Sequence, residues 1–127
     1  MSKLPSDPEP VFHPEVRVRV AARAPFFGPG PAQLLRCIRQ CGSVQGACTQ
    51  MGLSYSKGRA ILRMIKQQSG RKAVTCRKGG VGGGQAVLTP DGEELLEQYT
   101  RYEQDVRAYA AQRFDRYFAP AEQEDDR

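Results

Sequence analysis

The segment GSVQGACTQMGLSYSKGRAILRMIKQQSG, residues 42–70, contains the pattern from which the fold is most directly predicted. Apolar side chains recur at helical spacing in two runs, and Ser43 and Ser54 are placed to cap the two helices that follow them. Gly52 and Leu53 separate the runs and predict a tight turn. Two helices joined by such a turn form the helix-turn-helix pattern, whose second helix enters the major groove of DNA.

The second of these helices has two chemically different faces. A core face is predicted from residues at i, i+3, i+4 and i+7, namely Gly58, Ile61, Leu62 and Ile65. The opposite face holds only polar, small or basic residues: Ser56, Arg59, Ala60, Arg63, Lys66 and Gln67. A merely solvated amphipathic helix usually carries Glu on its outer face, and this one carries none. We therefore predict a recognition helix over about residues 54–68.

The segments before and after the helical region show the alternation of side chains that is typical of β-strands. RKAVTCR (71–77) and QAVL (85–88) surround a glycine run and predict a β-hairpin, and a helix-turn-helix followed by a hairpin is a winged helix. Upstream, VRVRV (16–20) alternates strictly and predicts a half-buried strand. A helix follows the GPGP break, and its inward face is predicted to hold Leu34, Leu35, Ile38 and Cys41.

The glycine run itself, RKGGVGGGQ (77–85), has two interpretations. A phosphate-binding loop of a nucleotide enzyme needs a helix directly after it, with Lys-Ser or Lys-Thr at its start. Here Gln85 and Ala86 lead into a strand-like segment instead. The run is therefore predicted to be the tip of a wing, over about 78–85, whose backbone approaches DNA phosphates closely.

A long helix is predicted over about 90–118, with Thr89 as its N-cap and Pro90 in its first turn. Its apolar positions form a seam spaced 4, 3, 4, 3: Leu95, Tyr99, Tyr102, Val106 and Tyr109. At 1.5 Å per residue the helix would be roughly 43 Å long, more than one small domain needs. The seam either packs only on its own chain or, as we predict, pairs with a second copy.

These elements predict a mostly α, α+β winged helix-turn-helix with an N-terminal strand and a long C-terminal dimerisation helix. The expected divisions are a disordered arm (1–14), the winged domain (15–89), the dimerisation helix (90–118) and an acidic tail (119–127). No apolar run is long enough to span a bilayer, and the N-terminus lacks the apolar core of a signal peptide. A cytoplasmic protein with no membrane partner is expected.

Charge is distributed very unevenly along the chain. Between Val16 and Pro90 there is no Asp or Glu, whereas the same 75 residues contain thirteen Lys or Arg residues. A basic surface kept for solubility would normally mix both signs. The absence of carboxylates indicates a polyanionic partner, and double-stranded DNA is the one predicted. It also removes the acid/base pair and the Mg²⁺ ligands that many enzymes need.

Four cysteines and one histidine, His13, complete the candidate chemistry. Cys37 and Cys41 are predicted on one helix face, but no recognised zinc spacing is present, so we expect no metal and no cofactor. Buried thiols are the first expectation, and a cysteine-based redox or metal sensor is the alternative. No nucleophile stands beside a base, so an enzyme is not expected.

Residues 16–110 resemble the DNA-binding domain of the ModE family, the molybdate-responsive regulators whose winged helix is related to that of LysR-type regulators. The motifs that carry the resemblance are Gly42-Ser43-Val44-Gln45, Gly52-Leu53-Ser54-Tyr55, the wing Gly79–Gly84, and Leu88-Thr89-Pro90-Asp91-Gly92. It implies dimerisation through the N-terminal strand and the long helix.

Two departures from the family pattern bear on function. Gln45 stands where a second Ser is common, and Gly58-Arg59 stands where Ala-Trp is common, which alters the predicted base-reading surface. The chain ends soon after the long helix, so we expect a stand-alone domain without the oxyanion-binding domains of the family. Molybdate sensing is therefore not carried over, and a separate effector-sensing protein is a candidate partner.

The sequence thus predicts a homodimeric, sequence-specific DNA-binding transcriptional regulator. The predicted DNA contacts are Ser43, Gln45, Ser54, Tyr55, Ser56, Lys57, Arg59, Arg63, Arg77, Lys78, Gly79, Gly80, Gly82, Gly83 and Gly84. The predicted dimer interface is Val16, Val18, Val20, Leu95, Tyr99, Tyr102, Val106 and Tyr109. A winged-helix protein-interaction module that has lost operator binding is the alternative.

Overall fold

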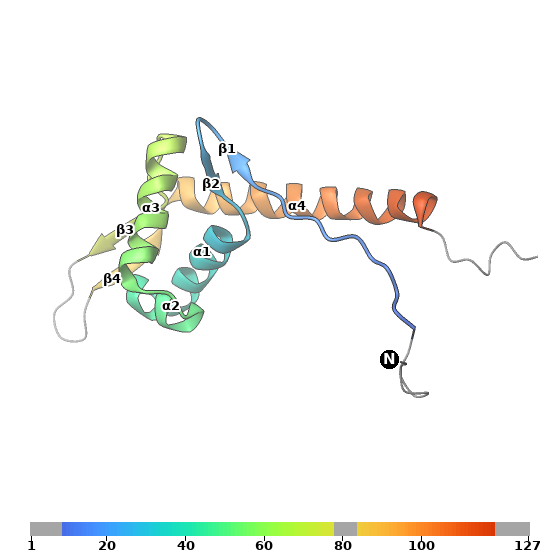
Figure 1. The fold of residues 1–127 in the computed structure, drawn as a ribbon. Coiled ribbons are helices and arrows are strands. Elements are labelled where there is room, and N and C mark those ends of the chain that lie inside the picture. The colour runs from blue at the N-terminus through green and yellow to red at the C-terminus, as the bar shows by residue number, and fades with distance from the viewer. Residues whose placement is uncertain (1–8, 78–83, 119–127) are drawn as a thin grey trace, which may run out of the picture.

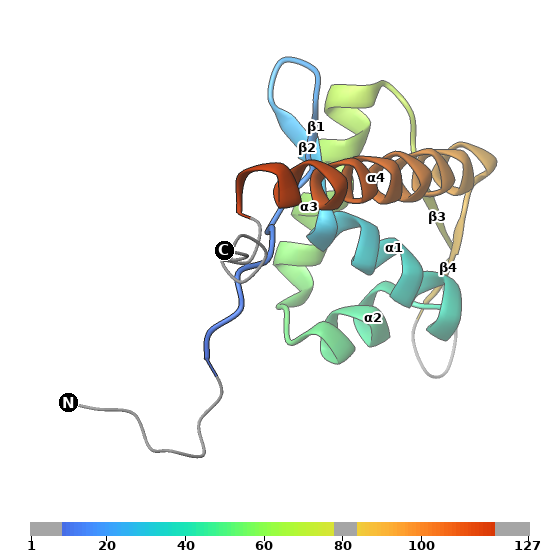
Figure 2. The same ribbon diagram turned by 90° about the vertical axis from the view of Figure 1, so that its right-hand side faces the viewer.

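Four helices and two short antiparallel hairpins make up the computed structural model, which describes residues 9–77 and 84–118 (Figure 1). Their order is β1 (Val20–Ala21), β2 (Pro25–Phe27), α1 (Pro29–Cys41), α2 (Val44–Met51), α3 (Tyr55–Ser69), β3 (Val74–Arg77), β4 (Gln85–Leu88) and α4 (Pro90–Tyr117). The three short helices pack together, and α4 crosses them and continues well beyond them (Figures 1 and 2). This is the mostly α winged helix-turn-helix that the sequence predicts.

The predicted helix boundaries are confirmed by their caps. Ser43 Oγ accepts the Gly46 N–H at 2.9 Å, and Ser54 Oγ accepts the Lys57 N–H at 3.1 Å. At the other ends, α1, α2 and α3 each stop at a glycine with a φ between 71° and 78°. Only glycine adopts this left-handed conformation without steric cost, so the positions of these glycines determine where each helix ends.

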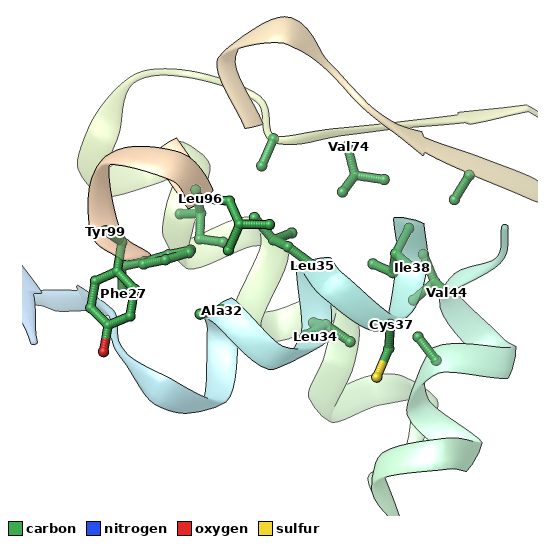
Figure 3. Close-up of a cluster of buried hydrophobic side chains, with 14 of the residues drawn as sticks. Phe27, Ala32, Leu34, Leu35, Cys37, Ile38, Val44, Val74, Leu96 and Tyr99 are labelled. Atoms are coloured by element: carbon green, nitrogen blue, oxygen red, sulfur yellow. The ribbon is translucent and has the colours of Figure 1, made fainter. Parts of the chain in front are cut away.

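The core forms around α1, whose Leu34, Leu35 and Ile38 are completely buried (Figure 3). The ring of Phe27 meets the ring of Tyr99 edge-on, with 5.1 Å between centroids. The Tyr99 hydroxyl donates a hydrogen bond of 2.9 Å to the carbonyl of Val18. Burial raises the pKa of the Tyr99 phenol, which favours the protonated form that this hydrogen bond requires.

The strand predicted over residues 16–20 is only partly correct. The alternation is present, since Val18 is buried while Arg17 and Arg19 are exposed. Regular pairing, however, begins only at Val20, which pairs with Phe27 of β2, a strand that the sequence did not predict. Among the described residues no strand lies beside 16–19, and an unpaired segment makes no ladder.

One inward position on α1 was also predicted wrongly. Cys37 is buried, whereas Cys41 is exposed. Cys41 lies in the last turn, next to the Gly42 cap where the chain bends into α2. Its thiol instead donates a hydrogen bond of 3.4 Å to the carbonyl of Ser43.

The seam predicted along α4 divides into two parts. Tyr99 is in the core of its own chain, and Leu95 and Val106 are half-buried against that core. Tyr102 and Tyr109 are 57% and 60% exposed.

The N-terminal segment before β1 extends in the direction of the distal half of α4 (Figure 1), and Phe12 contacts Phe118 with 6.1 Å between ring centroids. No described helix combines the length and apolar character needed to cross a bilayer.

The wing is joined to α4 through the backbone of Ala73. Its carbonyl accepts the N–H of Thr89 at 2.9 Å, and the Thr89 hydroxyl donates to the Lys72 carbonyl at 2.6 Å. Gly92 in the first turn of α4 lies against the same carbonyl, so close that an added Cβ would be 2.1 Å from the oxygen. This approach explains physically why a glycine follows Thr-Pro-Asp.

Replacing Gly92 by Ala is therefore expected to lower the free energy of unfolding by about 3 kcal/mol, because backbone must move to admit the methyl group. Urea denaturation followed by circular dichroism measures the change. Gly30→Ala is the matched control, since nothing lies within 4 Å of its added Cβ, and it should change stability by no more than about 0.5 kcal/mol. Equal stability of the two variants would contradict the close approach at Ala73.

Candidate nucleic-acid interface

A cleft of about 400 Å³ opens between the start of α2, the start of α3 and the β3–β4 hairpin. It is lined by Ser43, Val44, Gln45, Tyr55, Arg59, Cys76, Arg77, Gly84, Gln85 and Ala86. Six of these were predicted DNA contacts: Ser43, Gln45, Tyr55, Arg59, Arg77 and Gly84. Residues from three separate stretches of the chain therefore line one surface feature.

Arg59 bridges the recognition helix and the wing. Its guanidinium donates a hydrogen bond of 3.4 Å to the Cys76 sulfur on β3. The same guanidinium lies 5.9 Å from the centre of the Tyr55 ring, within cation–π range. These two contacts orient Arg59 before any ligand arrives.

The hairpin is held in place by a bond to the helix-turn-helix itself. The Ala86 N–H of β4 donates to the Gly42 carbonyl at 2.8 Å, which attaches the hairpin to the corner between α1 and α2. The four β3–β4 pairs run from Val74–Leu88 to Arg77–Gln85. The wing strands therefore have a fixed position relative to the cleft.

The electrostatics of the cleft are uniformly positive. Neither α2 nor α3 has an acidic residue in its first turn, where the helix dipole would attract an anion. Within the described residues, the ion pairs of Arg39 and Arg71 are made with Glu93 and Asp91 at the start of α4. No described ion pair involves Arg59, Arg63 or Arg77, so their charges are not neutralised by the protein.

The other predicted contacts lie outside the cleft lining. Ser54 is occupied as the N-cap of α3, while Ser56, Lys57 and Arg63 are exposed on α3. Lys78, Gly79, Gly80, Gly82 and Gly83 fall outside the described residues, so their predicted role is not addressed by the structure.

Sequence reasoning missed Cys76 as the partner of Arg59. Strand alternation places Cys76 on the same side as Val74, which suggests burial. The structure shows Val74 buried but Cys76 exposed. No sequence signal indicates that a guanidinium seventeen residues away contacts this thiol.

Cys37 and Cys41 do not form the matched pair that the sensor alternative assumes, because one is buried and the other exposed. Across residues 9–77 and 84–118, no three His, Cys, Asp or Glu side chains gather in a way that could hold a metal ion. Burial raises the pKa of the Cys48 thiol, which keeps this group neutral.

Gly58 is explained by its neighbour on α2. An added Cβ at Gly58 would lie 2.2 Å from the sulfur of Cys48, and both residues are buried. Gly58 stands where Ala is common in the ModE family, and the smaller residue makes room for the side chain of Cys48. The absence of a side chain at Gly58 lets α3 pack closely against Cys48 of α2.

Gly58→Ala is expected to destabilise the protein by about 1–3 kcal/mol, because the methyl group overpacks the α2–α3 contact. Adding Cys48→Ala removes the clashing sulfur, so the double variant should be more stable than Gly58→Ala alone. A double-mutant cycle from urea denaturation gives the coupling, expected at about 1 kcal/mol or more. Strict additivity of the two changes would contradict this contact.

The fold and the cleft together define a winged-helix domain with a basic, acid-free recognition face. Known proteins with similar sequences include transcriptional regulators. The chain is 37% identical over 73 residues to the molybdenum-pterin-binding protein MopB of Rhodobacter capsulatus, covering 58% of this chain and 27% of that protein. It is 34% identical over 77 residues to the transcriptional regulator ModE of Haemophilus influenzae, covering 61% and 30%.

A third relative, the DNA-binding transcriptional dual regulator ModE of Escherichia coli strain K12, is 34% identical over 74 residues, covering 58% of this chain and 28% of that protein. No family model matches the chain. The matched segment spans less than a third of the length of each of these relatives. The matches confirm the resemblance to ModE-like domains that the sequence motifs indicate.

Proposed function

We propose that the chain is a DNA-binding transcriptional regulator that inserts α3 into the major groove of double-stranded DNA. The observation that carries the proposal is the pair of basic side chains that line the cleft, Arg59 from α3 and Arg77 from the wing. No carboxylate of the described residues forms an ion pair with either of them. The relatives named as transcriptional regulators support the same function. The name of MopB connects that relative to molybdenum, so molybdenum-linked genes are the class of target proposed.

The base-reading residues in this proposal are Arg59 and Arg63, one helical turn apart on the outer face of α3. Arginine makes bidentate hydrogen bonds to guanine O6 and N7 in the major groove. Arg59 is pre-oriented by Tyr55 and Cys76, which lowers the conformational entropy lost on binding.

Phosphate contacts come from the edges of the cleft. The N-terminus of α2 faces the cleft through Ser43 and Gln45, and helix N-termini favour anions. Arg77 adds a charged donor from the wing. These contacts position the domain on the duplex without reading sequence.

The regulator acts as a homodimer in this proposal. Tyr102 and Tyr109 are large and exposed on α4, and they lie near the half-buried Val106 of the same helix. A helix of 28 residues is about 42 Å long, which takes this surface beyond the other helices. A two-fold copy would cover it and place two recognition helices on successive half-sites.

The function is tested by enriching duplexes from a randomised DNA library and measuring their affinity by fluorescence anisotropy. Arg63→Ala should reduce the difference in binding free energy between the enriched duplex and one with a substituted base pair by about 1–3 kcal/mol. Alanine cannot make the bidentate hydrogen bonds to a base that arginine makes. Arg116→Ala, which removes the same charge from the far end of α4, should leave discrimination unchanged. No enriched sequence and no salt-dependent binding by the wild type would refute the proposal.

The dimer is tested by sedimentation equilibrium, where the wild type should have twice the 14.1 kDa mass of one chain. Tyr102→Glu combined with Tyr109→Glu should shift the equilibrium to monomer, because two carboxylates would be desolvated at the interface. Ala111→Glu is the control, since this exposed residue lies on the opposite side of α4 from Tyr109. A monomeric wild type would overturn the dimer.

A further inference from the structure

The recognition helix has a hairpin on each side. The β3–β4 wing lies against the side that carries Arg59, which contacts Cys76. The β1–β2 hairpin lies against the other side, and Figures 1 and 2 both show α3 between the two hairpins. The sequence did not predict the β1–β2 hairpin, and none of the DNA contacts predicted above lies on it.

Arginines of the N-terminal segment face α3. Arg17 and Arg19 line one hollow of about 410 Å³ together with Lys57, Ala60 and Met64 of α3. Strand alternation explains this direction, because Val18, which lies between the two arginines, points to the core instead. The side chains of Arg17 and Arg19 therefore border α3 on the flank formed by Lys57, Ala60 and Met64.

The tip of the hairpin is fixed to the last turns of α3. The side-chain oxygen of Gln68 accepts two backbone hydrogen bonds, from the N–H of Arg23 and the N–H of Ala24, each at 2.9 Å. Arg23 is exposed at this tip and is not part of the hollow. The hairpin is thus held in a defined position beside the recognition helix.

The charge of this hairpin and of the segment directly before it is unbalanced. Residues 16–27 include three arginines and no carboxylate. In the part of the chain that the structure describes, no ion pair involves Arg17, Arg19 or Arg23, whereas Arg39, Arg71 and Arg107 are all paired with acids of α4. The acid-free window begins at residue 16 rather than at the helix-turn-helix, so it includes the whole hairpin.

We propose that the β1–β2 hairpin and the segment directly before it, residues 16–27, form a second wing, in which Arg17, Arg19 and Arg23 bind phosphates of the DNA backbone. This inference rests on the proposed insertion of α3 into the major groove. The groove is about 12 Å wide and is bordered by one phosphate strand on each side. With the β3–β4 wing at one border, a basic hairpin on the opposite flank of the helix meets the other border.

A small anion in the hollow is the competing occupant, and the geometry favours DNA. The floor of the hollow is largely apolar, with Phe26, Ile61 and Met64 among its lining residues. Arg23 lies outside it, at the hairpin tip, where a ligand confined to the hollow would not contact it. An extended phosphate strand contacts separated arginines, because its charges are spaced along the duplex.

The test uses Arg17→Ala/Arg19→Ala/Arg23→Ala, with the corresponding triple Lys variant as the charge-retaining control. The salt dependence of binding to the enriched duplex is measured by anisotropy. The Ala variant should show a slope of log K against log salt that is less steep by about 0.9 for each phosphate no longer neutralised, up to about 2.7 for all three. The Lys variant should keep most of the wild-type slope, and thermal melting verifies that all variants fold.

Hydroxyl-radical footprinting locates the contacts. The wild type should protect backbone on both borders of the groove, and the Ala variant should lose protection on the border opposite the β3–β4 wing. If the Ala variant matches the wild type in slope and footprint while Arg63→Ala still weakens discrimination, the second wing is wrong and the proposed function stands. If the wild type binds no DNA, the proposed function itself fails.

Discussion

The carbonyl of Ala73 is the point on which the relation between the wing and the rest of the molecule depends. It accepts the N–H of Thr89 and lies against the bare Cα of Gly92, so the base of β3 and the first turn of α4 share one contact. The hydroxyl of Thr89 caps α4 and also bonds the neighbouring carbonyl of Lys72. A side chain at Gly92 would clash with this carbonyl and force the base of β3 and the first turn of α4 apart.

The molecule separates its charges by element. The acids that neutralise Arg39 and Arg71 belong to α4, and they lie at the N-terminal end of that helix, where the helix dipole also favours them. Exposed ion pairs of this kind contribute little to stability, about 0–1 kcal/mol each. Their larger effect is on the electrostatic field, because they cancel positive charge along α4 and leave it uncancelled around α3.

Much of this architecture could be predicted from the sequence, because local chemistry determines it. Serine and threonine caps, left-handed glycines and the 3.6-residue period fix the helices within one or two residues. The β1–β2 pairing could not be predicted from the sequence. Strand β1 has only two residues and β2 only three, one of them a proline, so neither shows the alternation of a strand. Interactions between distant segments were equally hidden: Arg59 with Cys76, Gly58 with Cys48 and Gln68 with the hairpin tip each join residues that no local period relates.

The segment before β1 shows how one local pattern can serve two surfaces. Alternation places Val18 in the core beneath Tyr99 and leaves Val16 and Val20 half-buried, while Arg17 and Arg19 face α3. A slip of one residue would exchange the two sets, so the Tyr99 hydrogen bond to the Val18 carbonyl also fixes which side the arginines occupy. In the proposed dimer, the same segment lies along the helix that carries the seam. The hydrogen bond from Tyr99 therefore connects, within one chain, the helix of the proposed dimer to the segment that carries the arginines proposed to bind DNA.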